Sequence, residues 1–271
     1  MNDVTQASPS VAPPSNVEGG GHRVVGFNTI VIREFSRIIR IWGQTIVPPA
    51  ITATLYFIIF GSLIGRRIGD MGGFTYMQYI APGLIMMSVI TNSYGNVVSS
   101  FFGAKFGRHL EELLVSPLPN WIILCGYVSG GLARGLTVGS AGAGPGHRMS
   151  VHHLGVILLA VVLTSVTFAL GGFINAVFAR NFDQVNFVPT YILTPLTYFG
   201  GIFYSIAMLP GWAQNLSHAN PILYMVNAFR YGFIGFSDVD VRLAFALMLA
   251  LCVALFATAL ALLHRGTGIR E

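Results

Sequence analysis

The sequence predicts an all-α polytopic membrane protein: six transmembrane helices, an N-terminal interfacial amphipathic helix and a re-entrant periplasmic segment. Three observations lead to this fold class. Of the 271 residues, 54% are hydrophobic and only 9% are charged, whereas a soluble domain carries about 25% charged residues. The charges also border apolar stretches of the length that a membrane-spanning helix needs, about 20 residues.

Two regions precede the first span. Residues 1–22 are rich in Pro, Ser and Gly, and we expect a disordered tail there, without the features of a cleaved signal. Residues 24–42 follow a helical period, with Arg33, Arg37 and Arg40 on one face. The opposite face is apolar and holds Phe27, Val31, Phe35, Ile38 and Trp42. We expect an interfacial helix whose arginines face anionic lipid; a cytoplasmic helix packed on the protein is the alternative.

Charged residues mark the ends of the predicted spans, because a charge at the bilayer centre is costly. These spans are residues 44–65, 76–102, 113–133, 154–179, 186–206 and 243–263. The charge-free stretch from Gln184 to Phe229 is too long for one helix, and two proline-containing pairs interrupt it. We therefore expect residues 207–230 to enter the membrane and return. Residues 23–265 would form one six-helix domain, followed by a cytoplasmic C-terminal tail, 266–271.

The distribution of basic residues indicates that both termini are cytoplasmic. Six spans place the termini on one side, where nine basic residues would lie, against five on the other side; this follows the positive-inside rule. The net charge of +5 suits contact with anionic lipid headgroups. Because the basic residues are spread along the chain without a cluster, nucleic acid is not an expected partner.

The charged residues also bear on the energy source. None of the ten acidic residues lies inside a predicted span, which argues against an ion-coupled secondary transporter, although backbone carbonyls can also bind Na⁺. The only lysine, Lys105, lacks the glycine-rich turn of a P-loop. Any nucleotide energy must therefore come from a partner. His147, His152 and His153 lack the spacing and the additional ligands of a metal site, so no metal site and no catalytic residue are predicted.

The loop after the second span carries an amphipathic pattern. Residues 107–117 predict a short helix that Pro117 stops, with Glu111 and Glu112 exposed to a soluble partner. A solvated loop whose charges only mark topology is the alternative.

Several motifs in the chain resemble one family. The run Glu112-Leu113-Leu114-Val115-Ser116-Pro117 resembles the coupling-helix motif of type-2 ABC exporter permeases. Further similar stretches are Val47-Pro48-Pro49, Ala81-Pro82-Gly83-Leu84, Leu193-Thr194-Pro195 and Asn220-Pro221-Ile222-Leu223-Tyr224. Together they resemble the YadH-type inner-membrane permeases of Gram-negative bacteria, from about Phe27 to Arg265.

The resemblance implies a homodimeric permease in the bacterial inner membrane, with one ABC ATPase subunit docked under each half. ATP and Mg would be bound by that partner, with no cofactor in this chain, and the substrate would be an amphipathic or lipid-linked molecule moved outward. The implied ATPase-binding residues are Arg108, Leu110, Glu111, Glu112, Leu113, Leu114, Ser116 and Pro117. The implied re-entrant and exit-gate residues are Pro210, Asn220, Pro221, Tyr224 and Arg230. Arg230 could instead extend to the outer lipid headgroups.

One stretch departs from the family pattern. Gly139 to Ser150 contains four glycines, a proline and an arginine where the family is apolar. Our hypothesis is a compensated frameshift or a sequence error, which resequencing of the gene would test. The family register would also place Arg134 within the third span.

A rival function from another class is an integral-membrane enzyme acting on lipid-linked sugars. Such an enzyme needs carboxylates near the membrane interface. The candidates are Asp70, Asp183, Asp238 and Asp240, and none pairs with a histidine in the sequence.

Overall fold

The computed structural model describes residues 19–56, 58–60, 70–71, 73–107, 109–110, 115–116, 118–142, 151–266 and 268. Helices make up almost all of this part of the chain, which confirms the all-α class. The exception is a pair of two-residue antiparallel strands, β1 (Asp70–Met71) and β2 (Phe74–Thr75).

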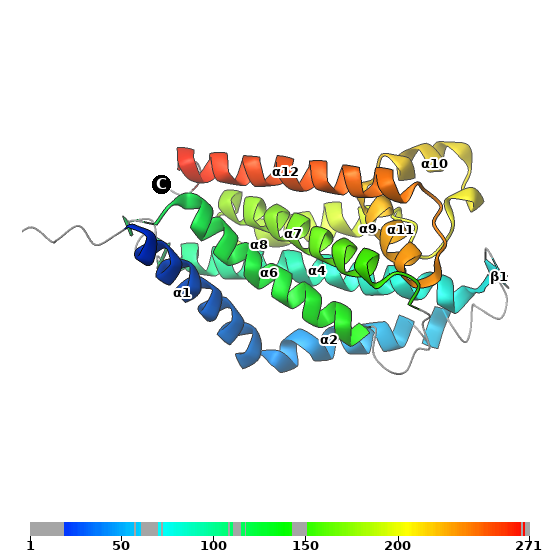
Figure 1. Cartoon of the computed structure of the whole chain (residues 1–271), viewed down its shortest axis with the longest axis horizontal. Helices are drawn as coiled ribbons and strands as arrows, with labels where there is room; N and C mark the ends of the chain where they lie inside the picture. The colour runs from blue at the N-terminus through cyan, green and yellow to red at the C-terminus, as the bar shows by residue number, and fades with distance from the viewer. Residues whose placement is uncertain are drawn as a thin grey trace, which may run out of the picture.

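Long helices run side by side in an elongated bundle (Figure 1). Its members are α4 (Tyr76–Phe106), α6 (Asn120–Gly142), α7 (Leu154–Phe178), α11 (Pro221–Ile234) and α12 (Val241–Arg265). Helix α4 contacts α6, α7 and α11 and so lies at the centre. Two helices flank the bundle: α1 (Gly19–Arg40), which crosses it obliquely, and α2 (Trp42–Tyr56).

The bundle has two distinct ends. The start of α1, the end of α12 and the connection from α4 to α6 lie together at one end, here the terminal end (Figure 1). The opposite end carries β1 and α10 (Gly211–His218) and is here the hairpin end. Both described chain termini therefore lie on one side of the bundle, as an even number of crossings requires.

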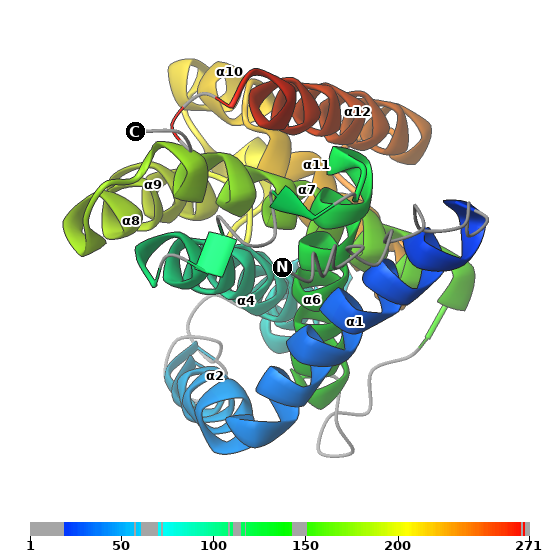
Figure 2. The same ribbon diagram turned by 90° about the vertical axis from the view of Figure 1, so that its left-hand side faces the viewer.

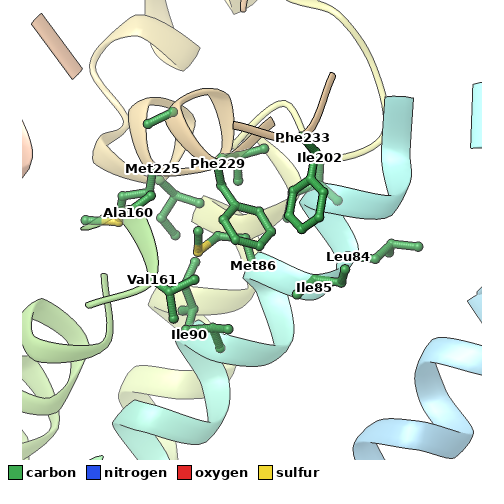
Figure 3. Close-up of a cluster of buried hydrophobic side chains, with 14 of the residues drawn as sticks. Leu84, Ile85, Met86, Ile90, Ala160, Val161, Ile202, Met225, Phe229 and Phe233 are labelled. Atoms are coloured by element: carbon green, nitrogen blue, oxygen red, sulfur yellow. The ribbon is translucent and has the colours of Figure 1, made fainter. Parts of the chain in front are cut away.

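Apolar side chains from α4, α7 and α11 form the core toward the hairpin end. Phe229 and Phe233 of α11 point toward α4, where Met86 is fully buried (Figure 3). The two phenyl rings lie edge to face with centroids 4.9 Å apart, an arrangement that aromatic pairs favour.

Glycines let the helices approach closely. Gly126 and Gly130 of α6 face α1, where an added Cβ would lie 2.5 Å from Ile30 and 2.9 Å from Glu34. Gly172 of α7 faces the backbone of α4, where a Cβ would lie 2.6 Å from the carbonyl oxygen of Tyr94. Small residues four apart, such as Gly126 and Gly130, are typical of helix contacts in membranes.

Four helices in the described part of the chain are long and apolar enough to cross a membrane. They are Trp42–Phe60, which contains α2, together with α6, α7 and α12. Helix α4 is longer, at 31 residues, but polar side chains such as Asn92 and Asn96 lower its hydropathy. Spans 76–102, 154–179 and 243–263 correspond closely to α4, α7 and α12.

The third predicted span is shifted. The sequence predicted residues 113–133, whereas α6 runs from Asn120 to Gly142 and contains Arg134. The prediction took Arg134 as the end of the span, but the helix continues because Arg134 lies beside a cleft rather than against lipid. Of the atypical stretch Gly139–Ser150, the first four residues are helical and 143–150 lie outside the described residues.

The fifth predicted span, 186–206, is also wrong in its bounds. Three helical pieces follow one another without a break: α8 (Phe182–Val188), the π-helical η2 (Pro189–Leu193) and α9 (Thr194–Tyr198). The side chain of Asn181 caps the start by accepting a hydrogen bond from the Gln184 amide. The helix ends before Gly201, whose φ of +68° breaks the helical path.

The remaining boundaries are close to prediction. Residues 19–22 belong to α1 rather than to the tail, and 1–18 lie outside the described residues. Region 207–230 contains α10, the end of the short 3₁₀ helix η3 (Ile206–Met208), and most of α11. Helix α10 stands at the hairpin end, and α11 returns into the bundle beside α7 and α12 (Figure 1).

Candidate functional site

The connection between α4 and α6 at the terminal end is held by three contacts. Lys105, in the last turn of α4, donates hydrogen bonds to the carbonyl oxygens of Val177 (2.7 Å) and Ala179 (3.0 Å) at the end of α7. Leu110 is 3% exposed and belongs to the apolar core of this end. Leu118 contacts Gly26 of α1, where an added Cβ would lie 2.4 Å from its Cδ2.

Only part of the expected coupling helix is described. His109 and Leu110 are helical, Val115 is highly exposed, and the Ser116 carbonyl accepts a hydrogen bond from the Leu118 amide. The other candidate residues lie outside the described residues: Arg108, Glu111, Glu112, Leu113, Leu114 and Pro117. The burial of Leu110 agrees with a helix anchored on its apolar side.

Helix α1 faces the bundle with a polar stripe. Arg37 donates hydrogen bonds to Glu34 (3.1 Å) and to the backbone and side-chain oxygens of Asn96 (both 2.9 Å). The Glu34 side chain is 1% exposed and also accepts a short hydrogen bond from Ser100. Arg33 donates to the hydroxyl of Tyr127 (2.7 Å).

The expectation that all three arginines of α1 face outward is therefore wrong for Arg37. Arg37 points into the bundle rather than toward lipid headgroups, and Arg33 reaches Tyr127, whereas Arg40 is exposed. On the predicted apolar face, Phe35 and Trp42 are exposed, whereas Ile38 is buried. A helix beside membrane spans gains from presenting apolar side chains to lipid and pairing its polar ones inside.

A second polar cluster lies near the hairpin end around Arg230. Its side chain is fully buried and donates to the Tyr79 carbonyl (3.1 Å), the Tyr79 hydroxyl (3.0 Å) and the Gly201 carbonyl (2.6 Å). Its Nη1 lies 3.7 Å from the carboxylate of Asp238, and the guanidinium stacks 3.9 Å from the centre of the Tyr79 ring. Arg230 therefore does not extend to the headgroups.

Asp238 completes this cluster. Its two oxygens accept hydrogen bonds from Tyr79 (2.7 Å) and Ser205 (2.8 Å). The cluster joins α4, the 199–205 turn, α11 and the segment before α12. A catalytic acid or base must reach the substrate. Because the Asp238 carboxylate is already hydrogen-bonded within the protein, it does not support the hypothesis of an integral-membrane enzyme.

The other candidate gate residues shape the hairpin. Pro210 precedes the first turn of α10, and Pro221 begins α11. Asn220 caps α11 by accepting from the Ile222 amide (3.0 Å) and donates to the Leu196 carbonyl (2.5 Å). Tyr224 donates to the His218 carbonyl (2.9 Å), which closes the bend between the two helices.

Comparison with known proteins identifies the family. A family model described as "ABC-2 type transporter" matches residues 25–234. The chain belongs to this family. It is 54% identical over 250 residues to "Inner membrane transport permease YadH" of Escherichia coli (strain K12), covering 91% of this chain and 98% of that protein. The same identity and coverage hold for the Shigella flexneri protein of that name.

More distant relatives carry a different name. "Nodulation protein J" of Neorhizobium galegae is 22% identical over 215 residues, 78% of this chain and 82% of that protein. Membership of the ABC-2 family makes this chain the transport permease subunit of an ABC transporter. It also implies a separate ABC ATPase as partner. The permease is not itself an enzyme.

Sequence reasoning missed both carboxylates of these clusters in the ABC-2 permease. Glu34 was treated as an ordinary acidic residue, although it shares a helical stripe with Ile30 and Ile38, both buried. Asp238 was considered only as a possible catalytic group. A signal was present in each case: Glu34 lies one helical turn before Arg37, and Asp238 lies in the loop that follows the helix of Arg230.

Proposed function

We propose that this permease exports an amphipathic or lipid-linked substrate, driven by ABC ATPase subunits that dock at residues 107–117. Two copies of the chain would form the translocation unit, with ATP and Mg²⁺ bound by the ATPase subunits. The observation that carries this proposal is the anchoring of the α4–α6 connection. Through Lys105, Leu110 and Leu118 it contacts α7, the core and α1, so a displacement of this loop would move several spans together.

Six crossings fit the described helices. We infer spans at α2, α4, α6, α7, the continuous 182–198 helix and α12, with 206–234 as a re-entrant hairpin. Helix α4 has the length to cross, and its polar residues lie against protein rather than lipid in most positions.

The distribution of charge supports a cytoplasmic terminal end. The described basic residues there include Arg23, Lys105, Arg180 and Arg265. The described hairpin end has Arg230 and Arg242 together with the acidic residues Asp70, Asp238 and Asp240. An excess of basic residues marks the cytoplasmic side of membrane proteins, so the ATPase would meet the loop from that side and the hairpin would face the periplasm.

The exposed faces of the helices support a homodimer. Asn186, Thr190 and Thr194 are exposed along the 182–198 helix. Asn186 and Thr194 donate to backbone carbonyls of the helix, but lipid would offer no partners to their remaining polar groups. By contrast, Leu247, Leu249 and Val253 are exposed on α12, as suits a lipid-facing surface. We therefore infer that the 182–198 helix faces a second copy. It lies beside α4, on the opposite side from α2 (Figure 2).

The experiment that tests coupling is the double substitution Glu111→Ala with Glu112→Ala. These carboxylates would pair with basic groups on the ATPase, and such partly desolvated pairs contribute more than exposed ones. We expect the variant to insert and dimerise normally but to lose transport. Leu113→Asp serves as a contrast and should impair insertion or folding, because it places a charge on the membrane-facing side. Membrane blots, ATPase pull-downs and transport assays would separate the two; normal ATPase binding and transport by the double variant would reject the coupling role.

A further inference from the structure

An open cleft of about 300 Å³ lies between α2 and α4, and α6 contributes one side chain to it. Part of its lining is polar and offers hydrogen-bonding groups from Gln44, Thr52, Ser88, Thr91 and Asn92. The rest is apolar and includes Tyr56, Leu84 and Met87. Arg134 of α6 is the one charged residue among the described residues that line this cleft. A lining with one cation, several polar groups and an apolar part suits an amphipathic anion.

Arg134 has no counterion in the described structure. No hydrogen bond or ion pair joins it to any described residue, and its Nε is buried without a partner. The nearest cluster offers none, because the carboxylate of Glu34 is already engaged by Arg37 and Ser100. Arg37 also lies close enough for its charge to act on Arg134. A guanidinium withdrawn from water costs several kcal/mol unless an anion accompanies it.

We propose that this cleft binds the phosphate group of an amphipathic molecule, with Arg134 as its principal ligand. The planar guanidinium donates in a fork that matches phosphate oxygens. Further donors come from Gln44 and from Asn92, whose side-chain amide donates only one of its two hydrogens to the Ser88 carbonyl. The tail would lie along Leu84, Met87 and Tyr56. The inference rests on the proposed function in one respect, namely that the bound amphipath is the cargo. The binding site itself does not depend on it.

The position of the cleft gives such a molecule a route of access. Helix α2 is largely exposed in the bundle, and Thr91 is exposed on α4. The phosphate of a lipid-like molecule could therefore enter sideways between the two helices, while its tail stays in an apolar environment. This makes Arg134 a residue that selects for charge, rather than one that holds helices together.

Binding is measured by native mass spectrometry of the purified chain in a neutral detergent. The probe is a lysophosphatidic acid, and the matched control ligand is the monoacylglycerol with the same chain but no phosphate. We expect Arg134→Gln to weaken binding of the phosphate probe at least about tenfold, the loss of one charge-assisted contact, and Arg134→Lys to weaken it less. Arg242→Gln, which removes an exposed arginine from α12, should change binding less than about twofold.

Two outcomes would overturn the proposal: equal binding by Arg134→Gln and the unaltered chain, or equal binding of the two ligands. Removing an unpaired charge should leave the thermal unfolding midpoint unchanged or raise it. If Arg134→Gln fails to fold, the variants Gln44→Leu and Asn92→Leu test the site with Arg134 intact. Each should weaken binding of the phosphate probe several-fold, and unchanged binding in both would reject the site.

A second experiment distinguishes a phosphate that belongs to cargo from one that belongs to a resident lipid. It uses the permease–ATPase complex in phosphatidylcholine nanodiscs. If the phosphate probe stimulates ATP hydrolysis and Arg134→Gln abolishes this stimulation, the result supports a cleft that binds cargo. If binding of the probe depends on Arg134 but does not stimulate ATP hydrolysis, the result supports a cleft that binds a resident lipid. If no ATPase assembles with the unaltered chain, the proposed function fails, whereas the binding measurement on the chain alone still decides the site.

Discussion

Arg230 and Glu34 show how this permease keeps charged side chains inside its helix bundle. Each is fully or almost fully buried, and each has an oppositely charged partner and further hydrogen bonds. Burying a charge without such partners costs several kcal/mol. Arg230 therefore acts as a fixed link between α4, α11 and the 199–205 turn, and Glu34 attaches α1 to α4.

The first prediction concerns Arg230. Arg230→Met should lower the free energy of unfolding by about 3–5 kcal/mol, because it leaves Asp238 buried without its cation. Adding Asp238→Asn should recover part of the loss, since the unpaired charge is then gone. Arg242→Ala, at an exposed arginine, is the control and should have little effect. Thermal unfolding in detergent measures all three; an unaltered midpoint for Arg230→Met would show that the link is not structural.

The second prediction compares two adjacent glycines of α7. An added Cβ at Gly172 would lie 2.6 Å from the Tyr94 carbonyl oxygen, whereas at Gly171 its nearest neighbour is a ring carbon 4.0 Å away. Gly172→Ala should destabilise the protein by about 1–3 kcal/mol, as overpacking does. Gly171→Ala should be neutral or stabilising because alanine favours helix. Unfolding midpoints of the two variants give the comparison, and equal midpoints would contradict the close α4–α7 contact.

At the scale of elements, apolar patterning predicts α4, α7 and α12 to within a few residues. It fails for α6 and the 182–198 helix because charges were used as boundaries. Arg134 can lie within a helix since a cleft adjoins it, and the 182–198 helix starts at the Asn181 cap. The orientation of α1 was not predictable from its amphipathic pattern, which defines two faces without stating which one packs. The hydrogen bonds that Glu34 and Arg37 form with α4 determine which face of α1 packs against the bundle.

The third prediction concerns the orientation of these elements. Six spans with the terminal end inside predict that reporters fused after Glu271 or at Gly107 report cytoplasm. A reporter at Gly69, in the loop between the first two spans, should report periplasm. Paired alkaline phosphatase and fluorescent-protein fusions measure each site. Cytoplasmic signal at Gly69 would contradict the span count or the orientation.

At the scale of the whole molecule, the 182–198 helix leaves a mixed surface of aromatic and polar side chains that one chain does not cover. The fourth prediction uses cysteine cross-linking across the inferred two-fold contact at the 182–198 helix. In a background with Cys125 and Cys252 replaced by Ala, Tyr191→Cys should form a disulfide-linked dimer on mild oxidation. Val253→Cys, exposed on the inferred lipid face of α12, should not. Cross-linking at Val253 but not at Tyr191 would place the second copy on the other side.

The family and its permease role follow from motifs along the sequence. For the Glu34 and Arg230 clusters, the sequence shows only the nearby charged pairs, and their other members could not be predicted. Their members lie far apart in the chain, as with Tyr79 and Asp238 or Glu34 and Ser100. Only the folded bundle brings them together. The sequence could not show either that Arg134 lacks a counterion. That follows from the packing, in which Glu34 already pairs with other residues.

The central claim is that this chain transports only with a separate ATPase, and ATP hydrolysis tests it most directly. The chain is purified alone and, in parallel, with its co-purifying ATPase, and both are reconstituted in the same lipid. We predict no hydrolysis by the homogeneous chain and robust hydrolysis by the complex, lost when the P-loop lysine of the partner is replaced. Sustained ATP hydrolysis by the homogeneous chain, free of any ATPase, would contradict the account.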